Sequence, residues 1–261
     1  MTPLLDVTDA KVHFGGVHAV DGVSIQLQDG ALHGLVGPNG SGKSTLLAAL
    51  SRMIDLTDGR LSFKGHDYQR DSAPAVARMG IGRTFQAVRV MSSRSVLENV
   101  MLGADAAIFG PGIVRNWLLP WRTRRQERQC REMAMAAIER LELTGMENHM
   151  VGTLSYGTQR RVEIARAVAA QPAVLLFDEP TAGMNRAERD EVAEVMRTLQ
   201  AGGLAQVLVE HDMQMITDVC DHVWVMNFGK LIAEGKPEAV VSDPAVQEAY
   251  LGKRGEEDVN P

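Results

Sequence analysis

Short apolar runs separated by glycine-containing turns make up the first fifty residues. From residue 19 to residue 27, apolar and polar positions alternate with a period near two, and Asp29-Gly30 follows as a turn. A short apolar run over residues 32–36 leads into a glycine-rich loop, and residues 45–50 predict a helix behind that loop. This region therefore combines an antiparallel start with an α/β pattern.

The pattern changes from strand-like to helical between about residues 95 and 158. Apolar residues recur there at helical spacing, without a convincing strand pattern. The recurring positions include Met133, Ala136, Ala137, Ile138 and Leu141. We therefore expect a helical subdomain inserted into the α/β region.

Helices and strands alternate again after residue 158. The pattern predicts a helix that ends before Pro172, strands over residues 173–177 and 206–209 with a helix over 186–199 between them, and a hairpin over 222–233. We expect residues 1–250 to form one α/β domain that contains the helical insertion. The polar residues 251–261 predict a flexible C-terminal tail.

The composition fits a globular protein and excludes several classes. Of the 261 residues, 45% are hydrophobic and 23% are charged, and the net charge of −6 argues against general nucleic-acid binding. No apolar run approaches the roughly 18 residues of a membrane-spanning helix, and the start lacks the features of a signal peptide. Cys130 and Cys220 show no CxxC spacing, which indicates a reducing compartment, and the seven histidines show no spacing typical of a transition-metal site.

Residues 37–44 match the pattern G-x-x-x-x-G-K-[ST] between a predicted strand and a predicted helix. Glycines let successive backbone N–H groups converge on phosphate oxygens, and the helix adds the positive end of its dipole. Lys43 can reach the β- and γ-phosphates, and the Ser44 hydroxyl can coordinate Mg²⁺. The candidate nucleotide-binding residues are Gly37, Pro38, Asn39, Gly40, Ser41, Gly42, Lys43, Ser44 and Thr45. A turn that is glycine-rich by chance is the alternative, which the Lys-Ser pair disfavours.

Two acids stand at the end of the apolar run over residues 174–177. A phosphate loop of this kind requires a carboxylate for Mg²⁺ and a group that orients water for hydrolysis. Asp178 is the candidate for the metal, and Glu179 is the candidate general base. Two surface acids at a strand end are the alternative, which the upstream loop makes the weaker interpretation.

Three further segments have ordinary structural explanations when each is taken singly. In Leu154-Ser155-Tyr156-Gly157-Thr158-Gln159, Ser155 and Gly157 precede a helix expected to begin near Thr158, where they can bind a second anion or where Ser155 can simply cap the helix. His211 follows a predicted strand and fits a structural histidine. Gln86 alone is an uninformative polar residue.

Taken together and in this order, the segments closely resemble the ATP-binding-cassette (ABC) ATPases over roughly residues 5–250. The resemblance implies a P-loop (RecA-like) core with an N-terminal antiparallel β subdomain and an inserted α-helical subdomain, ATPase activity, and ATP and Mg²⁺ as cofactors. It assigns the metal to Ser44, Gln86 and Asp178, catalysis to Glu179, His211 and Gln86, and the ATP of a partner subunit to Ser155, Gly157 and Gln159. Phe14 stands where the family places an aromatic ring under adenine, with core packing as the alternative.

At the subfamily level the chain looks like the larger ATP-binding subunit of branched-chain amino-acid importers. The residues that carry this likeness are those at 80–86, 95–100 and 178–185, together with Tyr156 and the insertion over 103–129. This likeness implies transmembrane permease subunits and a second, identical or homologous ATPase subunit as partners, with a substrate-binding protein acting indirectly and no nucleic acid. It also implies a peripheral position on the cytoplasmic face of the cell membrane.

Several features leave alternatives open. Tyr156 and Thr158 depart from the broad family pattern, and Asn185 occupies a position usually held by Asp. Residues 117–131 combine tryptophan with arginine, which suits a lipid or permease surface but also a solvated helix. The transported solute is not written in the chain, so urea, amides or other small solutes are alternatives, as are an exporter, a soluble ABC ATPase without a transport role and a P-loop kinase.

Overall fold

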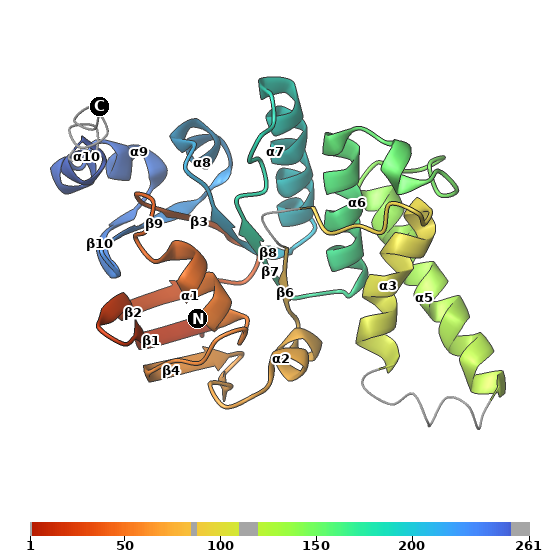
Figure 1. Cartoon of the computed structure of the whole chain (residues 1–261), viewed down its shortest axis with the longest axis horizontal. Coiled ribbons are helices and arrows are strands. Elements are labelled where there is room, and N and C mark those ends of the chain that lie inside the picture. The colour runs from red at the N-terminus through yellow and green to blue at the C-terminus, as the bar shows by residue number, and fades with distance from the viewer. Residues whose placement is uncertain (1, 85–87, 110–119, 252–261) are drawn as a thin grey trace.

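Two β-sheets of different kinds organise the computed structural model, which describes residues 2–84, 88–109 and 120–251 (Figure 1). The smaller sheet has the order β2-β1-β4-β5 and is antiparallel at every pairing. Its strands are β1 (Leu5–Phe14), β2 (Val17–Leu27), β4 (Asp58–Phe63) and β5 (His66–Asp67). The strand pattern expected near the N-terminus is thus present as a hairpin of β1 and β2, and β2 is an edge strand of this sheet.

The larger sheet has the order β10-β9-β3-β8-β7-β6 and is parallel except at the β9–β10 hairpin. Its strands are β3 (Leu32–Val36), β6 (Ile81–Arg83), β7 (Val174–Asp178), β8 (Ala205–Val209), β9 (His222–Asn227) and β10 (Lys230–Gly235). Every residue of β3, β7 and β8 is buried. Continuous apolar strands are typical of parallel sheets covered on both faces.

The two faces of the parallel sheet contact two different hydrophobic cores. In β7, Leu176 joins the core shared with the antiparallel sheet, while Leu175 and Phe177 join the core on the opposite face. Successive side chains of a strand point to opposite faces, so a single apolar strand serves both cores. The first core also contains α1 (Lys43–Leu50), and the second contains residues of α7 (Arg186–Ala201) and α8 (Met213–Val219).

The region expected to be helical contains α3 (Val96–Phe109), α5 (Pro120–Arg140), the 3-10 turn η1 (Val151–Thr153) and α6 (Tyr156–Ala169). These helices lie at the end of the molecule opposite β10 (Figure 1). Their buried residues extend the second core outward from the parallel sheet. The remaining helices are α2 (Ala73–Met79), α9 (Pro237–Val241) and α10 (Pro244–Leu251).

The start of the signature helix and the tryptophan- and arginine-rich stretch can be compared with their expected positions. The signature helix begins at Tyr156, two residues earlier than expected, because Ser155 caps it. Of the tryptophan- and arginine-rich stretch, residues 117–119 lie outside the described residues, whereas Arg124, Arg125 and Arg128 are exposed on α5. None of the helices in the described part of the chain combines the length and the apolar character needed to cross a membrane.

Candidate functional site

The glycine-rich loop between β3 and α1 has a shape that only glycine permits at two positions. Gly37 has a φ of 147° and Gly42 a φ of 102°. A Cβ atom would lie 2.1 Å from the Met226 carbonyl oxygen at Gly37, and 2.1 Å from the Ala19 carbonyl oxygen at Gly42. Positive φ angles and close backbone neighbours together exclude a side chain. The loop is therefore held in place by β9 and β2.

Lys43 lies at the first position of α1 and is 5% exposed. Its Nζ donates to the carbonyl oxygens of Gly37 at 2.7 Å and Pro38 at 3.0 Å. These bonds hold the ammonium group inside the curve of its own loop. The backbone N–H groups and the dipole at the N-terminus of α1 favour an anion there. A buried cation and a helix N-terminus therefore meet at one place.

Asp178 ends β7 and joins the loop to the parallel sheet. Ser44 Oγ donates to Asp178 Oδ1 at 3.1 Å, and Arg83 Nη2 donates to Asp178 Oδ2 at 2.8 Å. The Arg83 and Asp178 side chains are 13% and 9% exposed, so this ion pair is largely shielded from water. The Ser44 hydroxyl and the Asp178 carboxylate are oxygen donors of the kind that Mg²⁺ prefers, and the two groups already touch. These residues therefore fit a magnesium ion.

Sequence reasoning missed Arg83. It ends β6, which pairs in parallel with β7, so its side chain reaches the neighbouring strand's Asp178. The available signal was a basic residue at the carboxyl end of an apolar strand, three residues before Gln86. Gln86 itself lies outside the described residues.

Glu179 adopts a left-handed backbone conformation with a φ of 45°. Such a conformation is uncommon for a residue other than glycine, and it often marks functional sites. The backbone N–H of Glu179 donates to the Val209 carbonyl oxygen at 3.0 Å, which ties the residue to the end of β8. Its side chain is half-buried, directly after Asp178.

The end of β8 carries one exposed and one buried titratable residue. The His211 side chain is 62% exposed, whereas Glu210 is fully buried. Glu210 Oε1 accepts from the Thr181 N–H at 3.0 Å and from Thr181 Oγ1 at 2.6 Å. Burial raises the pKa of the Glu210 carboxyl, and the bonds from Thr181 oppose that change. Glu210 was also missed by sequence reasoning, and its bonds to Thr181 tie the segment after Glu179 to the end of β8.

Residues 154–159, here called the signature segment, present a second polar surface. Ser155 caps α6, accepting from the Thr158 N–H at 3.2 Å, and Gln159 Nε2 donates to the Leu154 carbonyl oxygen at 2.9 Å. Capping by Ser155 is thus observed, and it does not exclude anion binding at the same helix N-terminus. A Cβ at Gly157 would meet only side-chain carbons of Glu188, at 3.6 Å or more, and its Oε1 at 3.9 Å. Packing inside this chain therefore does not require glycine there.

Comparison with known proteins decides the family. A family model described as "ABC transporter" matches residues 20–182, and a second, described as "Branched-chain amino acid ATP-binding cassette transporter", matches residues 230–256. The chain belongs to the ABC transporter family. A high-affinity branched-chain amino acid transport ATP-binding protein, BraF of Pseudomonas aeruginosa, is 34% identical over 96% of this chain and 98% of its own length. LivG of Escherichia coli, a protein of the same description, is 34% identical over 96% and 98%.

Solved ABC cassettes have the same fold. A nucleotide-free ATP-binding cassette from an ABC transporter superposes with a TM-score of 0.83 at 30% identity, covering 95% of this chain and 99% of the other. The ADP conformation of the cassette MJ1267 gives a TM-score of 0.83 at 30% identity over 97% and 100%. The expected α/β fold of the ABC family is therefore confirmed.

Two residues of the ABC pattern gain a structural explanation. Phe14 is 55% exposed at the end of β1, so core packing is not its role and its ring is open to a ligand. Asn185 caps α7 and forms a capping box with Glu188, in which Asn185 Oδ1 accepts from the Glu188 N–H at 3.1 Å. Asparagine and aspartate are comparable helix caps, so this local structure is compatible with either residue.

Proposed function

We propose that the chain is the ATP-hydrolysing subunit of a membrane importer for branched-chain or other small amino acids. The observation that carries this proposal is the contact between Ser44 of the phosphate loop and Asp178, in a chain that also exposes Ser155 and Tyr156 of the signature segment. The family models and the BraF and LivG relatives, both branched-chain amino acid transport proteins by description, support the transport class. Urea, an amide or another small solute is the alternative cargo.

At the nucleotide, each group has a distinct proposed task. Lys43 neutralises the β- and γ-phosphates, Phe14 stacks on adenine, and Ser44, Asp178 and Gln86 hold Mg²⁺, which supplies further positive charge at the phosphates when bound. Glu179 accepts a proton from water that attacks the γ-phosphorus, and the bond to the β–γ bridging oxygen breaks to release ADP and phosphate. His211 contacts the γ-phosphate side of this site.

A second ATPase subunit completes the proposed site. Gly157 is not required by packing within the chain, and Ser155 lies exposed at the N-terminus of α6. Both properties suit a surface that approaches a phosphate belonging to another subunit. Ser155, Gly157 and Gln159 are therefore proposed to cover the ATP of the partner subunit, so that binding closes the dimer and hydrolysis reopens it.

The helical region offers a surface for a permease. A groove of about 500 Å³ between α3 and α5 is lined in part by the apolar side chains of Met91, Met101 and Leu102. Met91 and Leu102 are 52% and 43% exposed, and Met91 follows Gln86 by five residues. A permease segment bound there would lie five residues along the sequence from Gln86, which is proposed to hold Mg²⁺. A permease bound at this groove would hold the subunit peripherally, and the proposed side is the cytoplasmic face of the membrane.

Reconstitution tests the proposal. The chain is co-purified with its native permease and second ATPase subunit, placed in liposomes, and assayed for ATP hydrolysis with a substrate-binding protein loaded with leucine, urea or an amide. We expect leucine-loaded protein to stimulate hydrolysis and leucine uptake, and a complex carrying Lys43→Ala to show neither. Stimulation by urea or amide alone would replace the cargo, and a lack of any membrane partner would contradict a transport role.

A further inference from the structure

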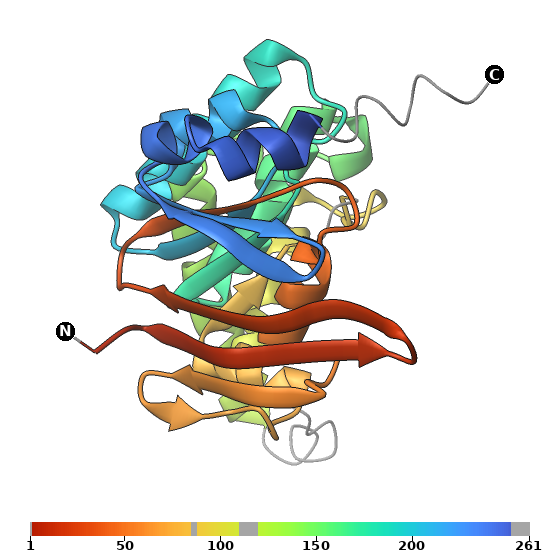
Figure 2. The ribbon, with the colours of Figure 1, turned by 90° about the vertical axis from the view of Figure 1, so that its left-hand side faces the viewer.

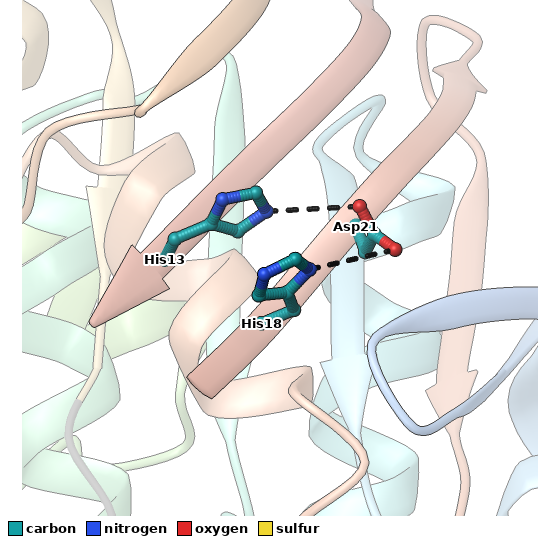
Figure 3. Close-up of side chains that lie close together, drawn as sticks. All are labelled: His13, His18 and Asp21. Carbon is teal, nitrogen blue, oxygen red and sulfur yellow. Dashed lines mark ion pairs between the residues drawn. The ribbon is translucent and has the colours of Figure 1, made fainter. Parts of the chain in front are cut away.

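A cluster of three metal-ligating side chains lies on the antiparallel sheet, apart from the candidate Mg²⁺ site. His13, His18 and Asp21 each direct a ligand atom toward the others, and these atoms lie within 4.8 Å of one another (Figure 3). His13 Nε2 is 3.6 Å from Asp21 Oδ1, and His18 Nδ1 is 3.9 Å from Asp21 Oδ2. The two imidazole rings are stacked, with centroids 3.9 Å apart and planes 12° apart.

The pairing of β1 with β2 creates this cluster. His13 pairs with His18 and Val12 pairs with Val20, so Ala19 is an extra residue on β2. In a regular strand, residues three apart point to opposite faces, whereas a bulge returns them to the same face. The bulge therefore places His18 and Asp21 on the face that also carries His13. The cluster depends on the register between two strands, so the spacing of histidines along the chain does not reveal it.

The chemistry of the three groups selects a class of metal. Two imidazole nitrogens and one carboxylate suit Zn²⁺, Ni²⁺, Co²⁺ and Cu²⁺, while Mg²⁺ and Ca²⁺ prefer oxygen ligands alone. His13 Nε2 is buried and makes no hydrogen bond within the part of the chain that the structure describes. The His18 side chain is 55% exposed, so an ion can enter from solvent.

Lys230 forms an ion pair with Asp21. Its Nζ lies 3.5 Å from Asp21 Oδ2, and its side chain is 65% exposed on the first residue of β10. The backbone supports this arrangement, because the Asp21 N–H donates to the Gly229 carbonyl oxygen at 2.8 Å. The hairpin of β9 and β10 lies beside β2 in the turned view (Figure 2). A divalent ion at the cluster would compete with the Lys230 ammonium for the same carboxylate.

We propose that His13, His18 and Asp21 form a binding site for one divalent transition-metal ion, with water completing its coordination. The site spans both strands of the β1–β2 hairpin, and His13 directly precedes Phe14, the last residue of β1. It also adjoins the phosphate loop, because the Gly229 N–H donates to the Ser41 carbonyl oxygen at 3.0 Å. Bound metal would therefore hold β1 and β2 together, and the stability it adds to the folded state would rise with the logarithm of the metal concentration above the dissociation constant.

Direct metal titration tests the proposal. The full chain, without a histidine tag and without nucleotide, is treated with EDTA, dialysed, and titrated with Zn²⁺ by calorimetry and with Co²⁺ by visible absorption. We expect one saturable ion per chain, and affinity at least tenfold weaker in His18→Ala and in Asp21→Asn, since each variant removes a ligand or its charge. Lys230→Met removes the competing cation and should bind the ion more tightly than the unmodified chain.

A matched control separates the cluster from ordinary surface histidines. His66 Nε2 lies 3.3 Å from Asp71 Oδ2 and its side chain is 64% exposed, but among the described residues it belongs to no cluster of three metal-ligating side chains. His66→Ala should leave the affinity unchanged, and thermal unfolding in EDTA should show that all variants fold. Equal affinity in His18→Ala and the unmodified chain, or no saturable ion in the unmodified chain, would overturn the proposal.

Discussion

The phosphate loop and the signature segment are both candidate surfaces for nucleotide, yet they differ in what holds their glycines. Added Cβ atoms at Gly37 and Gly42 would lie 2.1 Å from backbone oxygens of this same chain, whereas one at Gly157 would meet only the Glu188 side chain, at 3.6 Å or more. Packing within this chain therefore requires glycine at positions 37 and 42 of the phosphate loop. Packing inside the chain does not require glycine at position 157, which fits the proposal that Gly157 serves a contact with a partner subunit.

The charges of the two surfaces differ in the same way. Lys43 and Asp178 are buried and already bonded, to the loop carbonyls and to Ser44 and Arg83. Ser155 is exposed, and within the described residues its hydroxyl bonds to Thr158 of its own helix turn. A buried, internally bonded phosphate loop and a signature segment with Ser155 and Tyr156 exposed are the properties expected of a dimer with composite sites.

Lys43→Ala should produce the largest effect, because it removes the cation from the phosphate loop. We expect ATP hydrolysis to fall roughly 1000-fold, comparable to the loss of one preorganised charge-stabilising donor, and ATP binding to weaken as well. Phosphate release and binding of a fluorescent ATP analogue measure the two effects. Lys64→Ala, which removes an exposed lysine, is the control, and equal losses in both variants would contradict the assignment.

Glu179→Gln should separate binding from hydrolysis. The amide keeps the size of the side chain but cannot accept the proton, so hydrolysis should fall roughly 100-fold while ATP binding persists. ATP should then convert the variant to a dimer, detected by light scattering after size exclusion. Glu234→Gln changes an exposed acid on β10 and should behave as the unmodified chain. Ordinary turnover by Glu179→Gln would remove Glu179 as the base.

Much of the fold and the core of the site were predictable because they depend on neighbours in sequence. The period of two before residue 27, the apolar run before Asp178 and the loop around Lys43 are all local patterns. The strand order β10-β9-β3-β8-β7-β6 is not local, and the role of Arg83 follows from it because β6 lies beside β7. Glu210 was hidden for a similar reason, since its partner Thr181 follows a different strand.

Gly157→Ala compared with Gly42→Ala tests the contrast between the two glycines directly. Alanine at position 42 has a positive φ and a clash with Ala19, so it should destabilise the fold by about 1–3 kcal/mol. Alanine at position 157 has room and a helical backbone, so stability should be unchanged or slightly higher. Urea unfolding measures both.

Dimer formation supplies the second half of that test. In a Glu179→Gln background, we expect Gly157→Ala to weaken the ATP-driven dimer about tenfold, because the methyl group adds bulk at the N-terminus of α6, where the phosphate of the other subunit is proposed to bind. A stable Gly157→Ala chain that still forms the dimer at the original ATP concentration would show that the signature segment does not touch nucleotide.

Arg83→Gln should have the smallest effect on catalysis. It tests whether the Arg83 guanidinium neutralises the Asp178 carboxylate when no Mg²⁺ is bound. Removing the guanidinium leaves a largely buried Asp178 carboxylate without its ion-pair partner, which should lower the free energy of unfolding by about 1–3 kcal/mol in EDTA. Mg²⁺ with ATP supplies positive charge at the same carboxylate, so the stabilisation by Mg²⁺–ATP should be larger in the variant than in the unmodified chain. Arg189→Gln breaks another ion pair, 2.7 Å long with Asp212, and should gain nothing extra from Mg²⁺–ATP. If both variants respond alike, Arg83 is a structural partner of β7 and not a substitute for the metal's charge at Asp178.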